Sequence, residues 1–164
     1  MLNKETKRAA LIVLGIGLVF ILASLLSSTS FAATSGSIVL NAVVPQLVSV
    51  TVTPTNNPLT LSLAGVNVLI GTVLESSNSV AGYTVKLSSL NAGSLKNGTL
   101  GSHPYTLQYN AVTAALTVAP VTITNQGAQT SVVNFTKNVT VSFAGANDMQ
   151  GTYSDTLTFS IVAN

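Results

Sequence analysis

Cysteine and tryptophan are absent from this sequence of 164 residues, and charged residues make up only 6% of it. Without thiols, an exported form of the chain has no disulfides and must hold together by packing and backbone pairing. So few charges leave little material for acid–base catalysis. Helix signals are also scarce after position 32, where Thr, Val, Ser and Asn dominate and favour strands and turns.

The first 32 residues differ from the rest and have the order of a secretory signal. Three basic residues, Lys4, Lys7 and Arg8, precede an uncharged run at 9–26 and a Ser-rich stretch at 27–30. Ser30 and Ala32 fit the small positions before a cleavage site, so we expect a cut between Ala32 and Ala33. The alternative is an uncleaved membrane anchor, because the apolar run just reaches spanning length.

Removal of this leader changes the charge of the protein. The net charge of +2 comes from the leader, and the remaining 132 residues carry three lysines and three acidic residues. A neutral chain without a basic patch argues against a nucleic-acid partner. We also expect no membrane association once the signal is cleaved, and a single domain of ordinary size.

The mature chain repeatedly alternates apolar and polar residues with a period of two, which is typical of half-buried strands. The clearest runs are 38–44, 48–52, 59–63, 83–87, 139–143 and 153–161. Turn signals separate them, and Asn97-Gly98 predicts a tight hairpin. The expected fold is all-β, an antiparallel immunoglobulin-like β-sandwich preceded by an N-terminal signal helix.

Pro45 divides the first alternating run from the second, because proline cannot donate a hydrogen bond within a sheet. We therefore expect three parts: a signal peptide (1–32), an N-terminal extension (33–45) and a β-sandwich domain (46–164). The extension contains Ile38, Leu40, Ala42 and Val44 in one phase.

Residues suited to catalysis are few and scattered. The only histidine, His103, precedes Pro104 and is expected in a solvated turn. Asn147, Asp148 and Gln150 lack the ligand density of a calcium loop and indicate a plain turn. We therefore expect no enzyme, no metal and no cofactor.

Asp155 shares the phase of the apolar residues around it, so its side chain is expected to point inward. A buried carboxylate needs partners. The favoured interpretation places it at the rim of the core, bonded to backbone N–H groups of a loop; the alternative is a ligand site.

The C-terminal run begins after a glycine fourteen residues from the end and continues with alternating apolar residues: Gly151, Tyr153, Leu157, Phe159 and Ile161. This pattern resembles the C-terminal strand of chaperone–usher pilus (fimbrial) subunits. The stretch G-x-Y-x-D-x-L-x-F-x-I is also similar to the end of spore-coat-U-type domains. Residues 38–45 resemble the donor strand and following proline of colonisation-factor-type pilins, which lack cysteine.

The resemblance implies a subunit that assembles by donor-strand complementation. Ile38, Leu40, Ala42 and Val44 would then be the donor residues, and the C-terminal strand would line the groove that receives a donor. The implied partners are copies of the chain or sister pilins, a periplasmic chaperone and an outer-membrane usher. The implied location is the periplasm in transit and then the cell surface. Two departures are Ala163, where such pilins often have tyrosine, and the missing disulfide.

Two other interpretations stay open. Residues 37–44 could be the first strand of a complete sandwich in their own chain. The protein could also be a self-contained, adhesin-like binding module, secreted or surface-anchored, with Tyr105, Tyr109 and His103 as its only candidate aromatic cluster.

Overall fold

The structure is a computed structural model that describes residues 35–55 and 58–164. The predicted signal peptide and its cleavage site at Ala32 and Ala33 lie outside these residues. The chain divides after Ala42 into two units. The first is described only over residues 35–42, which form no strand, and the second, Val43–Asn164, holds every strand of the described residues.

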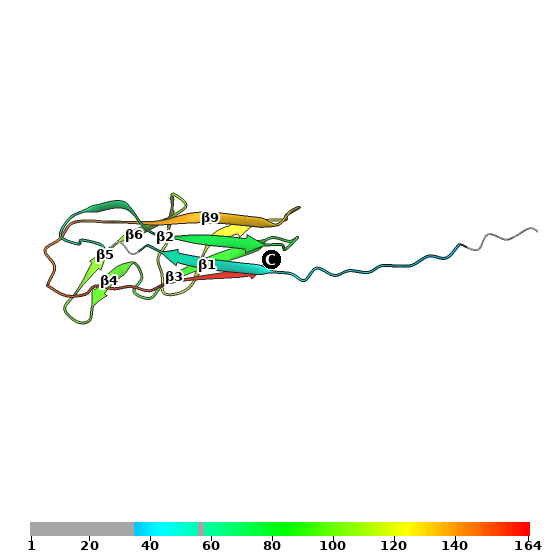
Figure 1. Ribbon diagram of the computed structural model, residues 1–164. Helices are drawn as coiled ribbons and strands as arrows, with labels where there is room; N and C mark the ends of the chain where they lie inside the picture. Colours follow the sequence, from blue (N-terminus) through cyan, green and yellow to red (C-terminus); the bar gives the residue numbers. More distant parts are fainter. Residues whose placement is uncertain (1–34, 56–57) are drawn as a thin grey trace, which may run out of the picture. The chain divides into compact units, whose positions relative to one another are not determined.

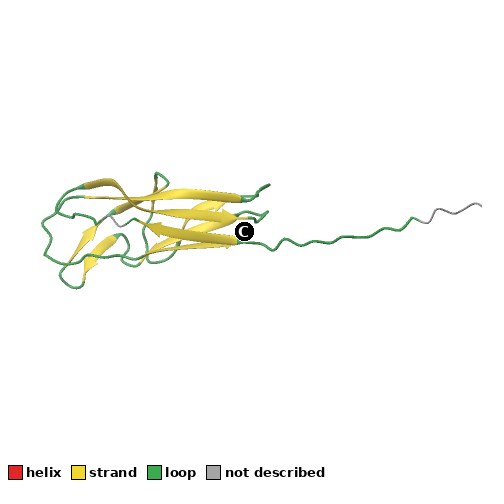
Figure 2. Cartoon of the chain, in the orientation of Figure 1, coloured by secondary structure: helices red, strands yellow, loops and turns green. Residues whose placement is uncertain are grey.

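The described part of the chain is all-β, and every strand pairing is antiparallel, as the alternation predicted (Figures 1 and 2). The strands are β1 (Val48–Pro54), β2 (Gly65–Ser77), β3 (Tyr83–Ser89), β4 (Ser94–Asn97), β5 (Gly101–Pro104), β6 (Thr106–Tyr109), β7 (Val112–Ala114), β8 (Val121–Gln126), β9 (Val133–Phe143) and β10 (Leu157–Ala163). No helix among the described residues is long and apolar enough to cross a membrane.

The described residues form three sheets. The first has the order β1-β2-β9-β6-β7, the second β10-β3-β8, and β4 pairs with β5 in a separate hairpin. This hairpin is the one that Asn97-Gly98 predicted: Leu100 N donates to Asn97 O at 2.8 Å, and Gly98 has a φ of +50°. Glycine suits that turn because it adopts positive φ without a Cβ clash.

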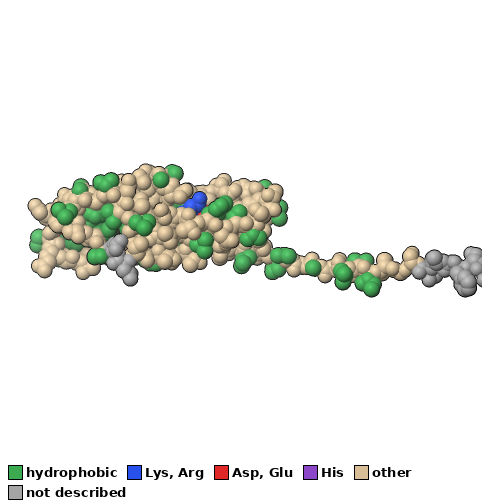
Figure 3. Space-filling view, turned by 45° about the horizontal axis from the view of Figure 1, so that its top comes forward, with side chains coloured by type: hydrophobic (Ala, Val, Ile, Leu, Met, Phe, Trp, Pro, Cys, Tyr) green, Lys and Arg blue, Asp and Glu red, His purple; other side chains and the backbone are tan. Residues whose placement is uncertain are grey.

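The two larger sheets share one core, because alternate residues of their strands point inward. Its fully or nearly fully buried members are Val73, Leu87, Leu107, Tyr109, Val139, Val141 and Phe143. Partly buried side chains from β8 and β10, including Ile123 and Phe159, pack against them. Outward positions carry mostly Thr, Ser and Asn, so uncharged polar side chains and backbone make up most of the face in Figure 3, with scattered apolar patches.

Two predicted strands are wrong in extent. Residues 59–63 form turns instead of a strand, although Leu59 and Leu61 still pack against the core. The C-terminal strand begins at Leu157, not directly after Gly151. Residues 151–156 have only one isolated bridge, between Ser154 and Lys96. Period-two alternation therefore marked residues that face the core, including some that have no strand partner.

The domain has two distinct ends. At one, the base end, β1 begins and β10 finishes beside the connection 78–82: Asn78 N donates to Leu47 O at 3.0 Å and Asn164 N donates to Gly82 O at 3.1 Å. At the other, the far end, β1 finishes and β10 begins. The loop 144–156 and the hairpin of β4 and β5 lie there (Figure 1).

Candidate functional site

β1 and β10 are the terminal strands of their respective sheets. Their Cα atoms approach within 8 Å, yet within the described residues no backbone hydrogen bond joins them. On the edge that faces the other strand, the backbone donors and acceptors of β1 and β10 therefore make no hydrogen bonds to each other. We call the line between these two edges the seam.

The side chains of β1 that face the core are incompletely covered at the seam. Val50 stands opposite Glu75 and Val52 stands opposite Val73, and opposite residues in an antiparallel pair share a face. Val73 is 0% exposed, whereas Val52 is 45% exposed. The core therefore lacks a cover over this part of β1.

β10 repeats this pattern from the other side. Leu157, Phe159 and Ile161 stand opposite residues of β3 that are fully buried, but are themselves only partly buried. These three residues were predicted to line a groove, and the structure places them along one edge. The matching wall from β1 was not assigned from the sequence, although its alternating Val48, Val50 and Val52 carried the same signal.

At the far end the seam meets a small pocket and then a wider depression. The pocket has a volume of about 90 Å³, and Ile70, Tyr105 and Leu157 are among its lining residues. The depression has a volume of about 700 Å³ and is lined in part by Met149, Gly151 and Tyr153. Leu59 and Leu95 line both, so the two spaces are adjacent. Tyr153 thus belongs to the depression instead of the strand.

Asp155 is held by four hydrogen bonds at the rim of the small pocket. Two come from hydroxyl groups, Ser89 at 2.5 Å and Tyr105 at 2.6 Å, and two from backbone N–H groups, Asn91 at 2.9 Å and Thr156 at 2.7 Å. Burial alone would raise the pKa of Asp155, but these bonds outweigh it and hold the pKa below its usual value. The predicted rim position with backbone N–H partners is confirmed.

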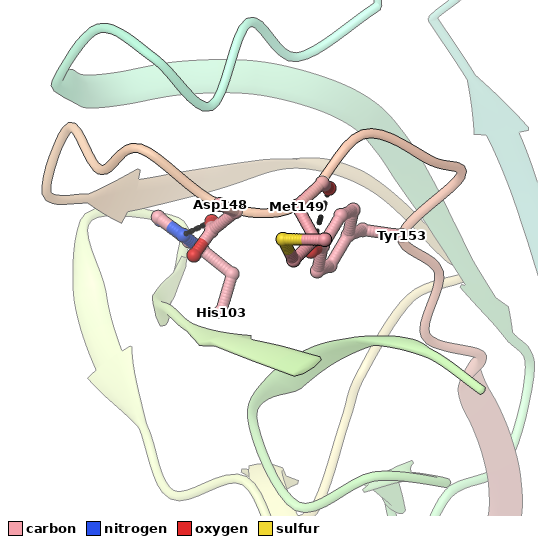
Figure 4. A network of polar contacts seen from close by, with 4 residues as sticks. All are labelled: His103, Asp148, Met149 and Tyr153. Carbon is pink, nitrogen blue, oxygen red and sulfur yellow. Dashed lines mark hydrogen bonds and ion pairs between the residues drawn. The ribbon is translucent and has the colours of Figure 1, made fainter. Parts of the chain in front are cut away.

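His103 does not lie where its sequence context predicts. It lies in β5 and is 3% exposed, instead of occupying a solvated turn. Its Nδ1 lies 2.5 Å from Oδ2 of Asp148, and its ring packs edge-on against Phe143 with centroids 5.8 Å apart. Figure 4 shows this pair beside Met149 and Tyr153, where the Tyr153 hydroxyl donates to Met149 O at 2.9 Å. These contacts fix the loop 144–156 at the far end.

Gly151 lies close to the hairpin of β4 and β5. A Cβ atom at this position would come within 1.9 Å of Nδ2 of Asn97. Lys96 and Ser154 exchange backbone hydrogen bonds of 2.9 and 3.0 Å next to this contact. The glycine singled out in the sequence therefore permits the loop and the hairpin to approach each other.

The N-terminal segment has the exposure expected of an unpaired strand. Ile38 and Leu40 are 89% and 92% exposed, Ala42 and Val44 are also exposed, and residues 35–47 form no strand. Among the described residues, the hydrogen bonds that tie this segment to the domain lie next to β1. There Asn78 Nδ2 donates to Pro45 O at 2.9 Å, and Leu47 N donates to Asn78 Oδ1 at 2.6 Å.

Glu75 is a buried polar residue that the sequence analysis did not single out. It accepts hydrogen bonds from the hydroxyl groups of Tyr83, Tyr109 and Thr124 at 2.9, 2.6 and 2.7 Å. Both tyrosines of the candidate aromatic cluster therefore have partners inside the domain: Tyr109 lies in the core, and the Tyr105 hydroxyl donates a hydrogen bond to Asp155. Over residues 35–55 and 58–164, no three His, Asp or Glu side chains come together as a metal-binding group.

No protein-family model matches the sequence, and no curated protein matches it.

Proposed function

We propose that the protein is a structural subunit of a surface fimbria, with an incomplete immunoglobulin-like sandwich that a strand from another subunit completes. The observation that carries this proposal is the seam. Two edge strands from different sheets lie side by side, unbonded, over apolar side chains that are only partly covered. A strand added there would pair with free backbone groups and cover the exposed core.

The N-terminal segment has the chemistry that such a strand needs. Ile38, Leu40, Ala42 and Val44 share one face when extended, and no charged residue lies between Ser35 and Leu47. Burial of four such side chains contributes on the order of 4–8 kcal/mol before the cost of ordering is subtracted. A contact of this kind does not close on itself, so repetition gives a filament.

Insertion requires the seam to open. Two strand spacings amount to about 9.6 Å, whereas Cα atoms of β1 and β10 approach within 8 Å. The edges must therefore part by at least about 2 Å to admit a strand. An assisting chaperone that holds the seam open until assembly, together with an outer-membrane usher, is part of this proposal, as is export to the cell surface.

The test uses the mature chain from Ala33 with Leu40→Asp, which prevents its own tail from acting as a donor. A synthetic peptide of residues 35–46 is added, and thermal unfolding is measured. A ligand that binds only the folded state at 100 times its Kd stabilises it by about 2.7 kcal/mol. We expect a concentration-dependent rise in Tm, and we expect the unmodified chain to form ladders that resist mild denaturant.

Two control peptides sharpen this test. The peptide with Leu40→Asp should give no rise in Tm, because it would bury a charge in the seam. The peptide with Val39→Asp should still act, because residue 39 faces the other way in an extended strand. Equal behaviour of all three peptides, or a reversible monomer without ladders, would contradict donor exchange.

A self-contained, adhesin-like module is the second candidate. The close approach of β1 and β10 favours it, because the seam is narrower than an inserted strand requires. On this alternative the added peptide has no effect on Tm, and the unmodified chain remains monomeric.

A further inference from the structure

We infer that the base end of one copy of the chain docks on the far-end depression of the copy whose seam its tail occupies. This inference rests on the proposed function and adds a second contact between subunits. The docking surface at the base end, which we call the base cup, has a volume of about 610 Å³ and is formed in part by Val44, Pro45, Val80 and Val132.

The length of the chain forces the two domains together. The donor run Ile38–Val44 has seven residues, the same number as β10, so it can pair along the whole length of that strand. Only Pro45, Gln46 and Leu47 separate that run from β1 of the same copy. Three residues span at most about 11 Å, so the donor's domain must lie directly against the end of the acceptor's seam.

These three residues are also held in place by hydrogen bonds to their own domain. Asn78 binds the backbone of Pro45 and of Leu47, and Gln46 Nε2 donates to Ser79 Oγ at 3.0 Å. The donor strand therefore leaves its own domain from a fixed point inside the base cup. Docking then costs little additional ordering of the chain.

The direction of insertion selects the surface that the base cup meets. A donor antiparallel to β1 would emerge at the acceptor's own base end, where two copies could exchange tails and close as a dimer. A donor parallel to β1 emerges at the far end, between β1 and β10, and leaves the acceptor's own tail free for the next copy. Only the second arrangement repeats into a fibre.

The two surfaces suit each other in polarity. In the base cup, Val80 is 78% exposed and Val132 is 66% exposed, and none of its lining residues is charged. The far-end depression presents the apolar side chains of Leu59, Leu61 and Met149. Its one charged lining residue, Asp148, is already paired with His103. Contact between the two surfaces covers apolar area without burying an unpaired charge.

The first experiment compares assembly of the full mature chain with Val80→Asp, with Met149→Asp and with Val112→Asp. Val112 is exposed on the edge strand β7, away from both surfaces, and serves as the control. Light scattering should show assembly about tenfold slower for the first two variants, because each places an unpaired charge in the contact. The control should assemble as the unmodified chain does.

The same variants separate this inference from the proposed function. The donor peptide carries no base cup, so it should raise the Tm of the Val80→Asp and Met149→Asp chains, each with Leu40→Asp, as much as that of the Leu40→Asp chain. Failure of the peptide in every chain contradicts donor exchange itself. A normal peptide effect together with normal assembly of both variants contradicts only the docking contact.

The second experiment uses the natural absence of cysteine. A chain with Val80→Cys and Met149→Cys is assembled and treated with a short bis-maleimide. Head-to-tail docking gives a ladder of covalent dimers, trimers and higher species, whereas Val80→Cys paired with Val112→Cys gives none. Covalent dimers from Val80→Cys alone would show base-to-base contact and overturn the inference.

Discussion

The hydroxyl group of Tyr109 donates a hydrogen bond of 2.6 Å to Oε1 of Glu75, and both side chains are buried. Tyr83, from the other large sheet, donates to the second oxygen of the same carboxyl group at 2.9 Å. Glu75 thus links the two sheets through polar contacts inside an apolar core. Burial, and after it the hydrogen bond to Glu75, raise the pKa of both tyrosines.

The first prediction concerns this link. Tyr109→Phe should lower the free energy of unfolding by about 1.5–3 kcal/mol, because it removes a donor from a buried acidic side chain. Urea denaturation measures the change. Tyr153→Phe is the matched control: its hydroxyl bonds to a backbone carbonyl in an exposed loop, so the loss should stay below about 0.5 kcal/mol. Equal losses would contradict a special role for the buried link.

The second prediction compares two valines that face the same core from neighbouring strands. Val73→Ala should cost about 2 kcal/mol, because its side chain is fully buried. Val52→Ala should cost about half as much in the free chain, since part of its surface already meets solvent. Chemical denaturation is used for both.

The same pair then reports on the seam. With the donor peptide bound, Val52 becomes covered, so Val52→Ala should weaken peptide binding by up to about tenfold. Val73→Ala should leave peptide affinity nearly unchanged. The reverse order of effects would place the peptide elsewhere.

The third prediction concerns two glycines with positive φ. A Cβ atom at Gly82, where φ is +94°, would lie 2.0 Å from the carbonyl oxygen of Gln126, whereas Gly98, with φ of +50°, has no atom within 4 Å of that position. Gly82→Ala should therefore cost more than about 3 kcal/mol or prevent folding. Gly98→Ala should cost about 1 kcal/mol, the cost of the left-handed conformation alone. Comparable losses in Tm would contradict the steric argument.

The fourth prediction follows from the lowered pKa of Asp155. A carboxyl group with a folded pKa below its unfolded value contributes stability above the unfolded value, near 3.9. That contribution is lost as the pH falls through the folded pKa. Asp155→Asn should therefore cost about 1–2 kcal/mol at pH 7 and progressively less below about pH 4. A difference that stays constant between pH 7 and pH 2 would show that the charge of Asp155 contributes nothing.

The sequence predicted the parts of the fold that alternation governs. The all-β class, the hairpin at Asn97-Gly98 and the inward positions of β10 all follow from period-two patterns and turn chemistry. The same rule failed at residues 59–63. There Leu59 and Leu61 face the core from a turn, because packing selects apolar residues with or without a ladder.

The sequence missed features that depend on distant partners. His103 was expected in solvent because proline follows it, but Asp148, 45 residues later, gives its ring a buried partner. Glu75 gave no local signal, since its three hydroxyl donors come from three other strands. Contacts between residues far apart in the chain leave no periodic trace, and only the folded arrangement reveals them.

The pairing of β1 with β2 also determines how the domain would carry tension. β1 follows the tail directly, and its seven residues pair in continuous register with β2 from Val48 to Pro54. Hydrogen bonds between antiparallel strands run perpendicular to them, so a pull on the tail along β1 loads these bonds together in shear. Failure then requires several bonds to break at once instead of one after another. A fibre built from such domains would resist stretching at its subunits' first strands.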